Sequence, residues 1–96
     1  MYDIGILGGM GPKATGVLFQ QIIDNTRAHA DQEHLRVAVV SIPQIPDRSA
    51  YLLGKSTQSP QPMLAAGIRD LDTLGVKIIL IPCNTSHYFY PQLAEN

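Results

Sequence analysis

The single cysteine of the chain, Cys83, is the residue best placed to do chemistry. It follows an apolar segment, residues 76–81, that predicts a buried strand, and it precedes a polar run, residues 84–86 (Asn, Thr, Ser), that could cap a helix. A thiol at the start of a helix lies among free backbone N–H groups and at the positive end of the helix dipole, and both favour the thiolate. A thiolate can take a proton from carbon or attack an electrophile, so we expect the reaction centre here.

A lone cysteine is usually a buried, inert thiol, so its position decides the interpretation. Cys83 follows the carboxyl end of a predicted strand, where open parallel sheets bind their ligands. His87 could steer a proton or tune the thiol, although a lone histidine in a first helical turn is more often structural. No metal site is predicted, because one cysteine and three scattered histidines lack the spacing of a ligand set.

A glycine-rich segment near the amino terminus is the second candidate. Residues 9–14 (Gly-Met-Gly-Pro-Lys-Ala) match the dinucleotide signature G-x-G-x-x-A. The dinucleotide signature also requires an acidic residue after the second strand, and residues 40–43 contain none. A phosphate-binding loop would need glycine immediately before Lys13, where this chain has Pro12. We therefore expect a smaller anion, such as a carboxylate, held by backbone N–H groups at the helix start. The alternative is that the glycines merely permit a tight turn.

Arg48 is the third candidate. It lies within Pro46-Asp47-Arg48, after the second predicted strand, and an arginine there suits a bidentate grip on a carboxylate. Taken alone, this motif is better explained as an exposed loop arginine paired with Asp47. However, all three candidates follow predicted strands, so they fall at the same edge of a parallel sheet, and this convergence favours a common site.

The elements that must position these residues alternate between strand and helix. Continuous apolar strands and amphipathic helices in alternation predict a parallel sheet covered on both faces, a three-layer α/β/α domain. A sheet of three strands has an exposed edge, which indicates part of a larger assembly. The predicted elements are strands at 4–7, 36–42 and 76–81, helices from 13 to about 29–31, from 64 to 74 and from 84 onward, and a long irregular stretch at 42–62.

Length and charge exclude several classes of function. The 96 residues predict one small domain, and seven basic against eight acidic residues give no basic face for nucleic acid or an anionic membrane. One cysteine excludes an internal disulfide and fits a reducing compartment. With no signal-peptide pattern at the amino terminus, we expect a cytoplasmic protein.

Three motifs occur in order along the chain: Gly8-Gly9-Met10-Gly11-Pro12, Ile45-Pro46-Asp47-Arg48 and Pro82-Cys83-Asn84-Thr85-Ser86-His87. Together they resemble the aspartate racemase branch of the aspartate/glutamate racemase superfamily, and the resemblance covers the whole chain. It implies one half of a two-lobe fold, with residues 1–96 as the amino-terminal lobe. It also implies an isomerase that needs neither PLP nor metal, in which Cys83 and a cysteine of the other lobe exchange protons with Cα of an acidic amino acid.

The resemblance further implies how the two carboxylates of aspartate or glutamate are bound. Arg48 would take the distal carboxylate. The α-carboxylate would be held by residues of the other two motifs, namely Met10, Gly11, Asn84 and Thr85, with Gly9 and His87 in support.

The departure from the family is length. Members are about twice as long, and the second lobe carries the partner cysteine, so the isolated chain should be inactive or incomplete. The partner would be the missing carboxy-terminal lobe or a second protomer, and a homodimer is expected. Two alternatives remain: a lobe that binds an acidic amino acid or another protein without catalysis, and two copies that face each other across one site through Cys83.

Overall fold

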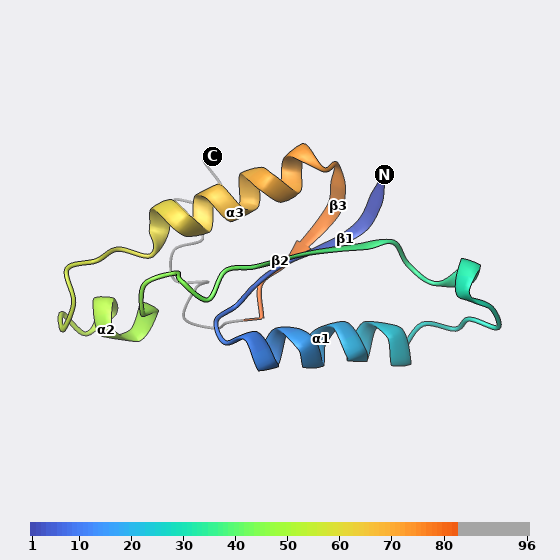
Figure 1. The fold of residues 1–96 in the computed structure, drawn as a ribbon, viewed down its shortest axis with the longest axis horizontal. Helices are drawn as coiled ribbons and strands as arrows, with labels where there is room; N and C mark the ends of the chain where they lie inside the picture. Colours follow the sequence, from blue (N-terminus) through green and yellow to red (C-terminus); the bar gives the residue numbers. More distant parts are fainter. Residues whose placement is uncertain (83–96) are drawn as a thin grey trace.

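The computed structural model describes residues 1–82, which form a parallel three-stranded sheet with helices on both faces. Strand order is β2-β1-β3, and α3 and α1 lie on opposite sides of the sheet (Figure 1). This confirms the predicted three-layer α/β/α class. The elements are β1 (Tyr2–Gly8), α1 (Pro12–Asp24), the 3-10 helix η1 (Asp31–Glu33), β2 (Val37–Ser41), α2 (Arg48–Leu52), α3 (Gln61–Thr73) and β3 (Val76–Leu80).

The main core lies between α3 and the sheet. Leu7 of the central strand and Leu64 and Leu71 of α3 are fully buried. Two glycines allow this close packing, since a Cβ on Gly67 would contact the side chain of Leu7, and one on Gly5 would lie 3.0 Å from Leu71 Cδ2. α3 therefore packs closely on the central strand, whose carboxyl end leads into the glycine-rich turn.

The opposite face of the sheet is covered less completely. Thr15 is the buried residue of α1, whereas Val17, Phe19 and Ile23 of the same helix are exposed. Ile78 of the edge strand β3 is 58% exposed. Apolar side chains therefore remain exposed on α1 and on the edge strand β3. No helix within residues 1–82 is long and apolar enough to cross a bilayer.

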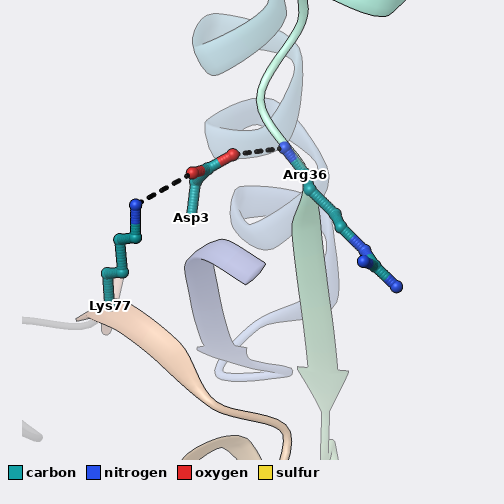
Figure 2. Close-up of polar contacts among 3 residues, drawn as sticks. All are labelled: Asp3, Arg36 and Lys77. Carbon is teal, nitrogen blue, oxygen red and sulfur yellow. Dashed lines mark hydrogen bonds and ion pairs between the residues drawn. The ribbon is translucent and has the colours of Figure 1, made fainter. Parts of the chain in front are cut away.

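A single carboxylate connects the amino ends of the three strands (Figure 2). Oδ2 of Asp3, on β1, accepts a hydrogen bond from the backbone N–H of Arg36 at 2.9 Å, and Oδ1 lies 3.8 Å from Nζ of Lys77 on β3. The Arg36 guanidinium lies over the Tyr2 ring, 4.4 Å from its centroid. These contacts support the register of β1 with β2 and β3. The register in turn determines how the carboxyl ends of the three strands are aligned.

We expect Asp3→Ala to lower the free energy of unfolding by about 1–2 kcal/mol, because it removes a charge-assisted hydrogen bond and an ion pair. Asp3→Asn retains an acceptor for the Arg36 N–H and should cost about half as much. Urea denaturation followed by circular dichroism measures both. The matched control is Asp72→Ala, an exposed acid on α3. If Asp3→Ala costs no more than this control, the contacts in Figure 2 contribute nothing to stability.

Two local predictions were wrong. The first helix ends at Asp24 rather than near residues 29–31. Beyond Asp24, the side chains of Asn25 and Thr26 donate to the carbonyls of Gln21 and Ile22 at 2.8 and 2.6 Å, and these bonds satisfy acceptors of the last turn. The stretch predicted to be irregular contains α2, which begins because Asp47 Oδ1 accepts a hydrogen bond from the Ala50 N–H at 3.0 Å. The end of α3 immediately before Leu74 and Gly75 agrees with the prediction.

Candidate active site

The glycine-rich turn joins the central strand to α1 and is shaped by close backbone contacts. Gly9 has a φ of 98°, and a Cβ there would contact the backbone of Ile42, whose carbonyl carbon would be 2.5 Å away. Ile42 is itself fixed, because its N–H donates to the Gly8 carbonyl at 3.0 Å. The turn therefore lies directly against the chain as it leaves β2, and only glycine fits at position 9.

Thr15 holds this turn from inside the helix. Its Oγ1 accepts a hydrogen bond from the Gly9 N–H at 2.9 Å and donates one to the Gly11 carbonyl at 3.2 Å. Thr15 is 4% exposed, and it is the only polar residue among residues 1–82 that is buried. We did not predict a role for Thr15 from the sequence. The available signal was a hydroxyl four residues after Gly11, on the helix face that also carries Leu18 and Ile22.

No side chain of α1 caps its first N–H groups or neutralises the positive end of its dipole. Gly11 is the N-cap residue without a capping side chain, Pro12 has no N–H to satisfy, and the first turn contains no acidic residue. The first N–H groups of a helix have no acceptor within the helix, and they form its positive end. The side chain of Met10 is buried in the core, so this residue can contribute to a site only through its backbone. These features suit an anion bound by the backbone.

Arg48 is a partly buried side chain with a defined orientation. Its Nη1 donates to the carbonyls of Ile45 and Pro46 at 3.3 and 3.4 Å. Within residues 1–82, its Nε is the buried side-chain nitrogen without a hydrogen-bond partner. Asp47 does not pair with it, because that carboxylate caps α2 through Ala50. The alternative of an Arg48–Asp47 pair is therefore wrong, and Arg48 keeps one buried donor, Nε, without a partner in the described part of the chain.

The third motif lies outside the described residues. Cys83, Asn84, Thr85 and His87 all follow residue 82, so their predicted roles stay predictions. The strand that leads to them is described, since β3 pairs with β1 in parallel and ends at Leu80.

The described parts of the candidate site follow the carboxyl ends of the parallel strands, with no hydrogen bond between Arg48 and the glycine turn. The glycine turn follows β1, Arg48 follows β2, and β3 ends at the same edge, where α2 and the start of α1 also lie (Figure 1). Ligands of open parallel sheets bind at the carboxyl ends of the strands. This edge offers a helix start and the guanidinium of Arg48, whose Nε has no hydrogen-bond partner among the described residues, and both kinds of group recognise carboxylates. Within residues 1–82, no three His, Cys, Asp or Glu side chains are grouped as a metal site requires.

A separate apolar pocket of about 350 Å³ lies between α1 and the end of β3. Leu18 lines one side, and the segment 79–82 (Ile, Leu, Ile, Pro) lines the other. Neither Arg48 nor the glycine turn contributes to it, so it is not a candidate for binding the carboxylates.

Comparison with known proteins gives consistent matches over nearly the whole chain. This chain is 29% identical to a curated protein, the "Broad specificity amino-acid racemase RacX" of Bacillus subtilis (strain 168). The match covers 96% of this chain and 41% of that protein. The aspartate racemase of Picrophilus torridus superimposes on 93% of this chain with a TM-score of 0.85 and 36% identity. An aspartate racemase homologue from Pyrococcus horikoshii OT3 shares the fold, with a TM-score of 0.74 over 99% of this chain at 20% identity.

The chain spans about two fifths of the length of these relatives, namely 41% of the curated racemase and 38% of the Picrophilus enzyme. Its fold is accordingly that of one lobe of an aspartate racemase structure. The family model for Asp/Glu/hydantoin racemases matches residues 7–96, which include the glycine turn, Arg48 and Cys83. The chain therefore belongs to the Asp/Glu/hydantoin racemase family.

Proposed function

We propose that this chain is the amino-terminal lobe of a PLP-independent racemase that interconverts L- and D-aspartate, with Cys83 as one of two acid/base residues. The observation that carries the proposal is that Arg48 and the uncapped start of α1 lie at one sheet edge in a chain of this family. The similarity to the Picrophilus aspartate racemase supports aspartate as the substrate. Glutamate is the second choice, because it carries the same two carboxylates.

The proposed reaction transfers one proton at each face of Cα. The Cys83 thiolate takes the Cα proton, the C–H bond breaks, and its electron pair is delocalised into the α-carboxylate. A thiol on the opposite face then donates its proton to Cα and becomes the thiolate. The developing negative charge is stabilised by the start of α1 and by Asn84 and Thr85, in a site that excludes water. No cofactor is required, because these groups replace the electron sink.

The second thiol has to come from outside this lobe, because Cys83 is the only cysteine of the chain. We place it in a carboxy-terminal lobe, as in a two-lobe racemase, and we expect the assembled enzyme to be a homodimer. A second protomer that contributes its own Cys83 is the alternative source of that thiol.

The proposal predicts that Arg48→Gln weakens binding of L-aspartate about 10- to 100-fold, the value of a charge-assisted hydrogen bond to a partly buried carboxylate. Isothermal titration calorimetry measures the dissociation constant. The matched control is Arg69→Gln, which removes the same charge from the exposed surface of α3. Equal losses in both variants would show that net charge, and not a contact at Arg48, governs affinity.

The test of the function is release of deuterium from aspartate labelled at Cα, followed by NMR in ordinary water with the 96-residue chain. A single thiolate reaches one face of the substrate, so we expect release from one enantiomer and not from the other, without racemisation. Release from both enantiomers that rises with the square of protein concentration would indicate two copies acting together. A folded chain that binds aspartate without releasing deuterium would be a binding lobe, and the proposed chemistry would require the second lobe.

A further inference from the structure

Thr15 has a hydrogen-bond arrangement that its place in a helix does not require. A threonine inside a helix commonly bonds only to the carbonyl four residues earlier, as Thr73 of α3 does with Arg69 at 2.8 Å. Thr15 makes that bond to Gly11 and also accepts one from the Gly9 N–H, outside the helix. A single hydroxyl therefore connects both ends of the three-residue turn.

The surrounding residues are shaped to admit this side chain. A Cβ on Gly8 would overlap the side chain of Thr15, so the hydroxyl reaches the turn only because position 8 is glycine. Gly9 is held from the other side by the backbone of Ile42. Gly8 and Gly9 are buried between Thr15 and the end of β2, whereas Gly11, at the other end of the turn, is exposed.

We propose that Thr15 is a positioning residue for carboxylate binding: its hydroxyl fixes the backbone from Gly9 to Gly11 so that the first-turn N–H groups of α1 meet the ligand. This inference rests on the proposed function and deepens it. Because Thr15 already occupies the Gly9 N–H, Gly9 gives the turn its shape and donates nothing to the ligand. The donors are the N–H groups of Lys13 and Ala14, which have no acceptor within the helix.

The first measurement concerns the turn alone, without ligand. Thr15→Val keeps the shape of the side chain but removes both hydrogen bonds, whereas Thr15→Ser retains the hydroxyl. We expect the Gly9 amide proton to exchange with solvent at least tenfold faster in Thr15→Val than in the unmodified chain, and near the original rate in Thr15→Ser. An unchanged exchange rate in Thr15→Val would overturn the inference.

The second measurement is titration with L-aspartate, followed through the amide signals of Lys13 and Ala14. We expect Thr15→Val to weaken binding at least tenfold and Thr15→Ser to remain within about threefold of the unmodified chain. Thr26→Val is the matched control, because it removes a similar hydroxyl bond to the last turn of the same helix, far from the glycine turn. An equal loss of affinity in Thr26→Val would mean that Thr15 acts only through helix stability, and this would overturn the inference.

The two proposals fail in different ways. If L-aspartate moves no amide signal of the folded, unmodified chain, binding of aspartate by this lobe is refuted. Faster exchange of the Gly9 amide in Thr15→Val would still show that Thr15 fixes the turn. If aspartate binds and Thr15→Val binds it with unchanged affinity, the proposed function stands and the positioning role is refuted. Signal dispersion in the NMR spectrum establishes that each variant is folded.

Discussion

Replacing Cys83 with serine is expected to lower the rate of deuterium release from Cα of aspartate at least about 100-fold, the lower range of what a positioned acid or base contributes. Serine keeps the size of the side chain but stays protonated at neutral pH, so it cannot take a proton from carbon. The α-proton of an amino acid is very weakly acidic. Without a cofactor to stabilise the carbanion, removal of this proton requires the thiolate of Cys83. The measurement compares both proteins with the same labelled enantiomer at equal concentration.

The single cysteine provides an internal control for this prediction. A thiol-alkylating reagent can modify only Cys83, so it should abolish release by the unmodified chain and leave the residual rate of Cys83→Ser unchanged. Matching circular dichroism spectra and urea midpoints would show that serine does not disturb the fold. If Cys83→Ser releases deuterium at the original rate, the base is another residue and the assignment of Cys83 is wrong.

The strands could be predicted from the sequence because their signal is local. Continuous apolar runs identified the three parallel strands, and the observed strands at Tyr2–Gly8, Val37–Ser41 and Val76–Leu80 overlap all three predictions. The end of the first helix was predicted too late, because Asn25 and Thr26, which bond to carbonyls of the last turn, were not considered as its end. The short helix α2 was missed because proline spacing indicated a loop, while a single capping contact from Asp47 decided the outcome.

The candidate site could be predicted in part, for a similar reason. Residue type and position after a strand selected the glycine turn and Arg48 as candidates, and their roles in binding stay predictions. The burial of Arg48 and its unpaired Nε depend on tertiary packing, which decided against the exposed pair with Asp47. Thr15 was missed because threonine is common in helices, and its contact with Gly9 requires knowing how the turn folds back. The roles of Cys83, Asn84 and Thr85 stay predictions, because those residues lie beyond the described part.

Gly9→Ala is expected to lower the free energy of unfolding by about 3 kcal/mol or more, the largest effect on stability that we predict. Two costs add. A left-handed backbone conformation with a φ of 98° costs an alanine about 1–2 kcal/mol. Its Cβ would also contact the backbone of Ile42, which cannot move away without breaking its hydrogen bond to the Gly8 carbonyl. Urea denaturation measures the total loss.

Two other glycines separate these costs. Gly54 has a φ of 74°, and a Cβ added there would meet no atom within 4 Å, so Gly54→Ala should cost about 1–2 kcal/mol from backbone strain alone. Gly11 lies in the same turn as Gly9 with a φ of −91° and open space around it, so Gly11→Ala should cost less than about 1 kcal/mol. If Gly9→Ala costs no more than Gly54→Ala, the turn moves away from Ile42 freely. Such a turn could not hold the start of α1 in the fixed position that carboxylate binding requires.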